Sequence, residues 1–359
     1  MRVTAFLPTH DLPEESMPWM AEARSVFDEL VIFLDEKRVT QGTVARAEKV
    51  ATRVQYHKAE TWYEWDRGAM ARACESEWVF LIERDEQLSS EWQQNSWRQI
   101  LETTEFTHFW MPRRWVVPGG RYINADPWWP DFHLRLLRNN LEATTFPTRL
   151  HDTISVPGPG GCFRSLAIHH HVLWLCSRAS REDRIRYYQQ LRPSGALGHY
   201  YLYEDHRPLE APLPKPTKLN ISKEVCWMEG LQPKEISKLS LKVSGVPEVL
   251  RPSEMFWLDS EVTNSTSKTV SACPPFPVRL AYHWIQQTTG QTVIFDGNRS
   301  GLFPGVPANT STQYQMSIVA PDVPGRYILQ TTMVQENVCW FENVEPAILQ
   351  EFVVSVIAE

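Results

Sequence analysis

The sequence predicts an α/β domain with a Rossmann-like, mostly parallel sheet, followed by an all-β, immunoglobulin-like sandwich. Residues 1–88 alternate between apolar runs and helical patterns, which is the rhythm of a parallel sheet with right-handed crossovers. Prolines then crowd residues 208–216, and the last third of the chain shows short strand patterns separated by turn signals. A chain of 359 residues is long enough for two domains. The boundaries expected are an α/β domain at 1–207, a Pro-rich linker at 208–237 and a sandwich at 238–359. The alternative for the Pro-rich segment is an extended wrap.

The elements expected in residues 1–88 are strands and helices in strict alternation. The strands are apolar runs, predicted at Arg2–Pro8, Glu29–Leu34, Arg53–His57 and from Trp78 onward. The helices lie between them, at Pro13–Phe27, Thr43–Val50 and Asp66–Cys74. The second and fourth strands close in acidic residues, Asp35 and Asp85. Because ligands bind at the carboxyl edge of open α/β sheets, two carboxylates at this edge indicate a site.

The segment Trp78–Leu88 is the most informative part of the chain. Its apolar half suits a strand buried on both faces, and it ends in Glu83-Arg84-Asp85-Glu86. Carboxylates in this position can hold a hard divalent cation that binds phosphate oxygens. The alternative is a solvated acidic turn after a core strand.

Residues 106–190 are rich in aromatic and basic side chains. Strands are expected at Phe106–Pro112 and Phe132–Leu137, and a basic helix at Ser180–Gln190. A strand end at residue 168 runs into three consecutive histidines, His169 to His171. One ring of the three can serve a metal or a phosphate, and the alternative is that none does.

The second domain is expected to be built of short strands with no helix between them. These strands are predicted at Ser240–Val243, Phe256–Val262, Arg279–Ile285, Gln291–Phe295, Thr312–Val319, Gly325–Gln335 and Glu351–Ile357.

Composition excludes several function classes. The net charge of -7 argues against nucleic-acid binding, and the six cysteines form no CxxC pair and are expected to be free thiols. The first residues enter a strand without a signal-peptide pattern, and no apolar run reaches the ~18 residues of a membrane span. We expect a cytoplasmic protein without a membrane span, although peripheral membrane association stays open. No feature predicts an oligomeric state.

Residues 1–200 resemble family 2 glycosyltransferases of the GT-A fold, and within that family the bacterial lipopolysaccharide-core β-glucosyltransferase type. Trp78–Leu88 is similar to the family's W-V-L-x-L-D-A-D-E-x-L, with Glu83 in place of the first Asp. Asp66–Met70 is similar to its RN-x-A helix, with Gly68 in place of Asn. Further matches are Phe27–Asp35 to the second strand, Pro130–Arg138 to P-D-x-x-x-R-L-F-R, Leu150–Asp152 to V-H-E, and Ile168-His169 to the strand end that precedes a basic helix. The sandwich loosely resembles accessory domains of bacterial polysaccharide-assembly proteins.

The resemblance implies inverting transfer of a sugar from a nucleotide-diphosphate sugar, a UDP-sugar by preference, to a hydroxyl of a glycan or glycolipid acceptor in surface polysaccharide assembly. The metal, Mn²⁺ or Mg²⁺, would be held by Glu83, Asp85 and His169. The residues expected to bind the nucleotide-sugar are Pro8, Thr9, His10, Asp35, Arg67, Arg84, Arg181 and Arg184. The catalytic base would be Asp152, with Asp131 as the other candidate; the alternative for Asp131 is a cap or a salt bridge to Arg135 or Arg138. Trp128 and Trp129 would form an acceptor platform through ring stacking.

Two other function classes remain open at this stage. A non-catalytic carbohydrate-binding or scaffold protein on a degenerate transferase fold is suggested by the departures at Glu83 and Gly68. A nucleotidyltransferase would share the sheet and the carboxylates, but it needs a Gly-rich loop after the first strand. Residues Pro8–Asp11 contain no glycine.

Overall fold

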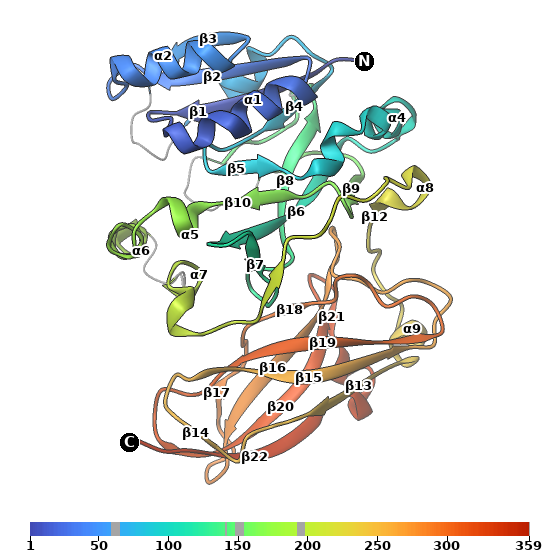
Figure 1. Ribbon diagram of the computed structural model, residues 1–359. Coiled ribbons are helices and arrows are strands. Elements are labelled where there is room, and N and C mark those ends of the chain that lie inside the picture. The colour runs from blue at the N-terminus through green and yellow to red at the C-terminus, as the bar shows by residue number, and fades with distance from the viewer. Residues whose placement is uncertain (59–64, 141, 148–153, 192–197, 359) are drawn as a thin grey trace. The chain divides into compact units, whose positions relative to one another are not determined.

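A computed structural model gives the structure of residues 1–58, 65–140, 142–147, 154–191 and 198–358. The chain forms two compact units (Figure 1). The first contains residues 1–123, 131–202 and 210–226, and the second contains residues 124–130, 203–209 and 227–359.

The first unit is built on a mixed sheet whose order is β3-β2-β1-β4-β8-β6-β7-β11. Its parallel part consists of β1 (Val3–Thr9), β2 (Glu29–Asp35), β3 (Arg53–His57) and β4 (Trp78–Leu81). The predicted β-α-β alternation is therefore confirmed over residues 1–81, with strand ends within one or two residues of those expected.

Helices cover both faces of the parallel strands because the side chains of a strand alternate between faces. Leu30 and Ile32 of β2 pack in one cluster with α1 (Met17–Val26) and α2 (Gln41–Val50). Val31 and Phe33 pack in the other cluster with Met70 of α3 (Arg67–Arg72). Both faces of the strand are thus apolar, as its unbroken hydrophobic run predicts.

The remaining strands make the sheet mixed rather than mostly parallel. β8 (Asp131–Arg138) runs antiparallel to β4 and β6 (His108–Val117), followed by β7 (Arg121–Ile123) and β11 (Glu210–Pro212). A short ribbon of β5 (Glu86–Leu88) and β10 (Ile168–His170) attaches to β6 through a parallel pairing of β10. The smaller helices of this unit are α4 (Arg98–Thr103), α5 (Val172–Leu175), α6 (Arg178–Leu191), α7 (Gly198–Tyr201) and α8 (Ile221–Glu224).

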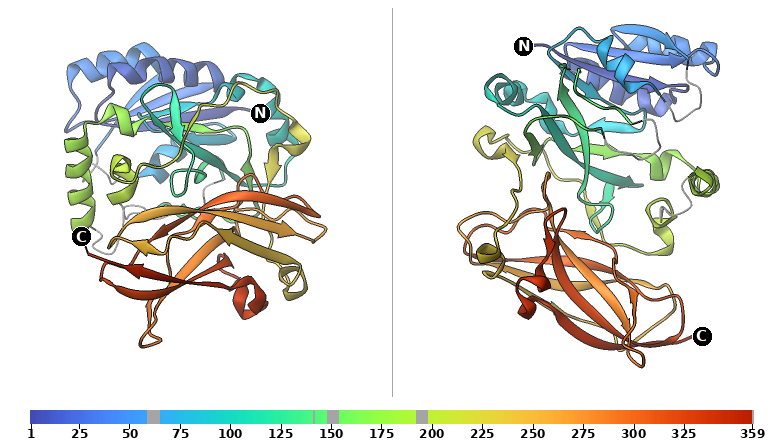
Figure 2. Two further views of the ribbon diagram at one scale, coloured as in Figure 1. Left: turned by 60° about the horizontal axis from the view of Figure 1, so that its bottom comes forward. Right: turned by 180° about the vertical axis from the view of Figure 1, so that it is seen from behind.

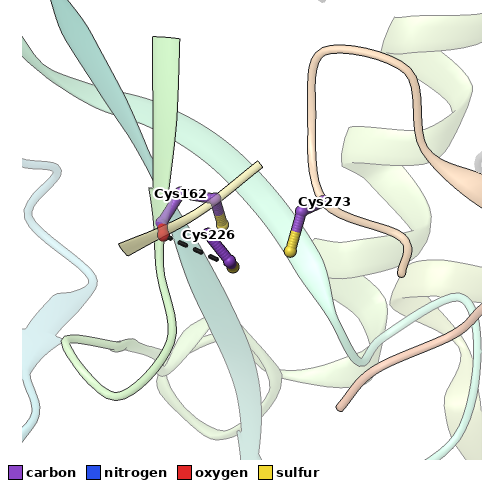
Figure 3. Close-up of side chains that lie close together, drawn as sticks. All are labelled: Cys162, Cys226 and Cys273. Carbon is purple, nitrogen blue, oxygen red and sulfur yellow. Dashed lines mark hydrogen bonds between the residues drawn. The ribbon is translucent and has the colours of Figure 1, made fainter. Parts of the chain in front are cut away.

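The segment expected to be a linker is divided between the two units, and residues 210–226 wrap around the first one. The buried Glu224 carboxylate accepts hydrogen bonds from the backbone N–H groups of residues 164, 165 and 166, at 3.1, 2.7 and 3.1 Å. Beyond it, β12 (Val225–Cys226) pairs with β9 (Gly160–Phe163), and the Cys226 thiol donates to the Cys162 carbonyl at 3.5 Å (Figure 3). This segment therefore packs on the first unit despite its prolines, because other backbone groups of the segment form hydrogen bonds with that unit. All six cysteines are free thiols, as expected.

The second unit contains two sheets, a three-stranded and a seven-stranded one (Figures 1 and 2). The first is β13 (Leu239–Ser244), β15 (Met255–Asn264) and β19 (Thr310–Val319). The second has the order β14-β22-β20-β16-β17, where β16 is Val278–Gln286, β17 is Thr292–Ile294, β20 is Gly325–Gln335 and β22 is Gln350–Val356. All seven predicted strands are present. The sequence patterns missed the two-residue strands β14 (Val249–Leu250), β18 (Ser300–Gly301) and β21 (Cys339–Trp340), and also the short helix α9 (Pro233–Ile236).

The two sheets are joined by buried aromatic side chains with polar tips. The Trp284 indole of β16 donates to the Val319 carbonyl of β19 at 2.9 Å, and the Tyr282 hydroxyl accepts from the Val319 N–H at 3.0 Å. Both rings are buried, so each contributes apolar area to the core while its polar atom is satisfied. Among the described residues, no helix has both the length and the apolar character required to cross a bilayer.

Candidate functional site

The acidic turn after β4 lies at the carboxyl edge of the parallel strands. Residues 83 and 86 close this turn on each other, because the Glu86 N–H donates to the Glu83 carbonyl and the Glu83 N–H donates to the Glu86 carboxylate, both at 3.0 Å. The Asp85 carbonyl accepts from the His171 N–H at 2.8 Å, which connects the turn to the end of β10. The expected cluster at the sheet edge is therefore an ordered turn rather than a solvated loop.

Two of its three carboxylates are paired with arginines from the antiparallel part of the sheet. Arg135 of β8 lies 2.6 Å from Glu86 and 3.2 Å from Glu83. Arg113 of β6 lies 3.5 Å from Glu86, and Arg67 lies 3.8 Å from Glu83. Burial alone would raise the pKa of Glu83, but Arg135, Arg67 and Arg113 outweigh burial and hold that pKa well below its ordinary value. Glu83, expected as a metal ligand, is therefore placed in an ion-pair network.

Asp131 is enclosed in the same network. Its Oδ2 accepts from Arg113 Nε and Nη2, at 2.9 and 2.7 Å, and from the Trp115 indole at 2.8 Å. Its Oδ1 lies 3.1 Å from His133 Nε2. Burial opposes ionisation, but Arg113 and His133 hold the pKa of Asp131 well below its ordinary value. Both oxygens are occupied, so the salt-bridge interpretation of Asp131 holds, with Arg113 as the partner instead of Arg135 or Arg138.

Asp85 is the member of the acidic turn that has no arginine of the described residues within salt-bridge distance. Its carboxylate is 13% exposed and lies 3.8 Å from His170 Nδ1. Burial and the neighbouring Glu83 carboxylate raise the pKa of Asp85, although Arg184 and Arg84 act in the opposite direction. The His170 ring is 5% exposed, and its Nδ1 has no hydrogen-bond partner in the part of the chain that the structure describes. Burial and Arg113 lower the pKa of His170 well below its ordinary value, so the ring is neutral; in the tautomer with its proton on Nε2, Nδ1 can accept a hydrogen bond or bind a cation.

Strand alternation decides which of the three histidines reaches the acidic turn. In the parallel pairing of β10 with β6, His170 is the partner of Trp115 and His169 is the partner of Arg114. His170 therefore faces Asp85, while His169, the residue expected as a ligand, belongs to the opposite side of the strand. His171 is occupied elsewhere: its ring stacks on Trp19, with ring centroids 4.1 Å apart, and its Nδ1 accepts from Trp174 at 2.7 Å.

Residues expected to contact the nucleotide line the ends of β1 and β2. Pro8 and Thr9 are the last residues of β1, and the Thr9 hydroxyl is bonded to Asp11 within the turn. Arg84 lies 2.7 Å from Asp11, and burial together with Arg84 lowers the pKa of His10. This group lies at the same sheet edge as Asp85.

Asp35, expected to contact the base or ribose, is fully buried. Its Oδ1 accepts from the Lys37 N–H at 3.1 Å and its Oδ2 lies 3.1 Å from Arg38 Nε. Contact between this carboxylate and a nucleotide requires the Arg38 side chain to move.

The two basic residues expected on helix α6 have different positions. Arg181 is buried, and it donates to the carbonyls of Tyr201 and Cys176, at 2.5 and 3.3 Å, so it holds α6 in place. Arg184 is half-buried, lies over the Tyr201 ring at 5.7 Å and is the cation that acts most strongly on Asp85. Arg184 therefore lies close enough to act on the acidic turn, whereas the hydrogen bonds of Arg181 stay within its own part of the chain.

The remaining residues that were expected at the site are Arg67, Trp128, Trp129 and Asp152, and they lie in different parts of the chain. Arg67 is the first residue of α3, which is capped by the Asp66 side chain. A Cβ on the next residue, Gly68, would lie 3.1 Å from the Phe146 ring, so there is little room for the Asn that the family pattern has at this position. Trp128 and Trp129 belong to the second unit; Trp128 is fully buried, so it offers no face for stacking, and Trp129 packs against Phe303. Asp152 lies outside the described residues.

The sequence did not predict the roles of four residues around the acidic turn, which are Arg113, Arg135, His133 and His170. A signal existed for two of them, since Asp131, His133 and Arg135 occur at alternate positions of one predicted strand and so share a face. His133 is one-third exposed, and burial with Arg113 lowers its pKa to about 4.

Comparisons with known proteins give only weak likenesses. No protein-family model matches the chain, and no curated protein matches it. Among solved structures, S. aureus TarS aligns with 99% of this chain and 78% of its own at 12% identity and a TM-score of 0.34. TarS 1-349 aligns with 57% of this chain and 73% of its own, at 14% identity and the same TM-score of 0.34. A β-glucosidase from Listeria innocua aligns with 33% of this chain at 14% identity and a TM-score of 0.24, and the match spans only 16% of its length. Scores of this size establish neither a common fold nor a common function.

Proposed function

We propose that this protein is an inverting, metal-dependent glycosyltransferase that moves a sugar from a nucleotide-diphosphate sugar to a hydroxyl of a glycan or glycolipid acceptor. A UDP-sugar is the preferred donor, and assembly of a bacterial surface polysaccharide is the proposed context, both through the family resemblance. The observation that carries the proposal is the pair Asp85 and His170 at the carboxyl edge of the parallel strands. There a carboxylate that forms no salt bridge with an arginine lies 3.8 Å from a buried imidazole nitrogen without a hydrogen-bond partner, both statements being made of the described residues.

The donor set of this pair fits a divalent cation. A carboxylate oxygen and an imidazole nitrogen are both atoms that such a cation accepts as ligands, and here the two atoms lie 3.8 Å apart. An orphaned buried nitrogen is costly unless something binds it, and a neutral imidazole favours Mn²⁺ over Mg²⁺. When bound, such an ion would neutralise the charge that develops on a diphosphate leaving group. Arg184 supplies a second positive charge beside Asp85.

The salt bridges around Asp85 and His170 explain why a cation would bind at Asp85 rather than at a neighbouring carboxylate. Glu83 and Glu86 share Arg135, and Asp131 is held by Arg113, so each of these carboxylates has an arginine beside it, although burial still raises the pKa of Glu86. Asp85 retains negative charge for an incoming ion. Its ordered turn also fixes the carboxylate before the ligand arrives, which lowers the entropic cost of binding.

The acceptor hydroxyl needs a base, and Asp152 remains the proposed one. Asp131 is unsuited, because Arg113 and Trp115 hold both its charge and its geometry. His133 is a further candidate, since Asp131 fixes the His133 ring through Nε2 and leaves Nδ1 as the acceptor nitrogen.

The test is a thermal-shift titration of the full chain with UDP, with and without Mn²⁺, together with a screen of UDP-sugars for slow hydrolysis. Ligand at 100 times its Kd stabilises the native state by about 2.7 kcal/mol, which is easily measured. We expect stabilisation by UDP to require Mn²⁺ and to be lost in Asp85→Asn. The proposal would be contradicted if stabilisation by UDP were the same with and without Mn²⁺ and the same in Asp85→Asn as in the wild type.

A non-catalytic carbohydrate-binding or scaffold protein is the second candidate, and one observation favours it. The arginines compensate Glu83 and Glu86 internally, which leaves the acidic turn with one uncommitted carboxylate where the family pattern has two aspartates. In that case no nucleotide should shift the thermal transition, whereas a glycan should.

A further inference from the structure

An exposed aromatic ring of the second unit is held unusually firmly for a surface side chain. Phe295 follows β17 and is 58% exposed. One of its faces stacks on His283 of β16, with ring centroids 4.7 Å apart and an interplanar angle of 20°. The His283 Nδ1 also donates to the Phe295 carbonyl, so ring and backbone are fixed together. The opposite face of Phe295 is not covered by this stack.

Trp340 of β21 completes the aromatic group. Its ring centroid lies 5.2 Å from that of Phe295 and 4.6 Å from that of His283. The Arg299 guanidinium lies 4.6 Å from the Trp340 ring centroid. Trp340 is half-buried and therefore supports Phe295 rather than competing with it for a ligand. We call Phe295, His283 and Trp340 the aromatic platform.

The loop that carries the platform is anchored by a close approach of backbone to a ring. A Cβ on Gly297 would lie 2.3 Å from Tyr282 Cζ, so only glycine fits there. The Gly297 N–H donates to the Tyr282 carbonyl at 3.3 Å, and the Gly297 carbonyl accepts from Arg299 at 3.1 Å. Tyr282 is buried in the core, so the loop is attached to the most rigid part of the unit. A ring ordered before binding loses less entropy when a ligand stacks on it.

Polar groups flank the platform. Arg299 pairs with Asp296 and lies 3.0 Å from Glu336. Asp296 is 68% exposed, so its carboxylate remains accessible to a ligand. A flat apolar face beside an accessible carboxylate matches a pyranose ring, which has an apolar C–H face and hydroxyl donors at its rim. Carboxylates outnumber the single Arg299 guanidinium around the platform, which favours a neutral sugar over an anionic one.

We propose that the aromatic platform is a binding site for neutral glycans, separate from the site on the first unit. The apolar face of a hexose stacks on Phe295, and its hydroxyls bond to Asp296 and Arg299. The proposal does not depend on the transferase function, because the platform lies in one unit and its residues take no part in the network around Asp85. It holds equally for a catalytic and for a non-catalytic protein.

The experiment measures retention of the full chain on immobilised neutral oligosaccharides of glucose, galactose and N-acetylglucosamine, in EDTA and without nucleotide. We expect the wild type to bind at least one of them and Phe295→Ala to bind it roughly two- to tenfold more weakly, the range of an aromatic stacking contact. Phe295→Tyr should keep the affinity. The matched control is Val323→Ala, which removes another exposed apolar side chain of the same unit, 59% exposed, and should leave binding unchanged.

Three results would overturn the proposal. The wild type binds none of the oligosaccharides, or Phe295→Ala binds them as well as the wild type does. The third is a lower molar mass of Phe295→Ala in light scattering, which would identify the platform as a contact between copies of the chain. The thermal transitions of each variant, measured without any ligand, show whether the second unit, which contains the platform, remains folded in every arm.

Discussion

Two carboxylates of one turn should affect stability in opposite directions. Asp85 is buried without an arginine partner, and its pKa is raised by burial and by Glu83. Glu83 has a pKa well below its ordinary value because Arg135 and Arg67 outweigh burial. The ionised form of Asp85 is thus disfavoured by folding, whereas that of Glu83 is favoured.

The magnitude follows from exposure and distance. Asp85→Asn removes a disfavoured charge at a functional site and should raise the free energy of unfolding by about 0.5–2 kcal/mol at pH 7. Glu83→Gln removes contacts at 3.2 and 3.8 Å from a side chain that is 34% exposed. Because solvent screens part of that attraction, the loss should be about 1 kcal/mol. For a unit of this size each kcal/mol moves the Tm by about 2–4 °C.

The pH dependence gives the same contrast. A raised folded-state pKa means that Asp85 binds more protons in the native state, so its destabilising effect appears as pH rises from its ordinary value of 3.8 through the raised pKa. Glu83 contributes stability that is present above its ordinary pKa of 4.5 and is lost as pH falls through the lowered value. The benefit of Asp85→Asn should therefore grow with pH across this window and then level off.

The assay is differential scanning calorimetry of the wild type and both variants between pH 4 and 8 without metal. The quantity compared is the Tm of the transition that the substitutions shift. A matched control is Asp296→Asn, an exposed carboxylate of the second unit, which should leave that transition in place. A lower Tm in Asp85→Asn at pH 7 would refute the reasoning, because it would mean that the Asp85 charge is stabilised by contacts other than those described.

Three further predictions concern single groups. His170→Ala should remove the Mn²⁺-dependent part of UDP stabilisation, whereas His169→Ala, one residue away on the other side of β10, should keep it; equal losses would contradict the assignment by strand alternation. Asp152→Asn should lower sugar transfer by roughly 10²–10⁴-fold with UDP binding intact, and the same pattern in His133→Gln instead would move the base to that ring. Gly297→Ala should destabilise the second unit by about 1–3 kcal/mol, since its Cβ would meet the Tyr282 ring at 2.3 Å, and an unchanged Tm would show that this loop yields.

Much of the fold could be predicted from local patterns. The run from Trp78 to Ile82 is apolar on both faces, and the structure buries both faces between the helices. The strand pattern after residue 238 likewise predicted every long strand of the second unit, because half-buried strands show their period of two directly. The prolines left open whether this stretch is a linker or an extended wrap, and the structure shows that residues 210–226 wrap around the first unit. Those pairings use backbone groups, and backbone hydrogen bonds leave no signature in residue type.

The sequence by itself determined that carboxylates stand at the carboxyl edge of a parallel sheet, since that follows from where apolar runs stop. Only the tertiary structure decided which of them is uncommitted. Arg113 and Arg135 are remote in sequence from the acidic turn and reach it because β6 and β8 join the sheet beside β4. The same pairing turns His170 rather than His169 toward Asp85. Charge compensation depends on distances between strands, and a shift of register by one residue would reverse it, so no local pattern could have assigned these roles.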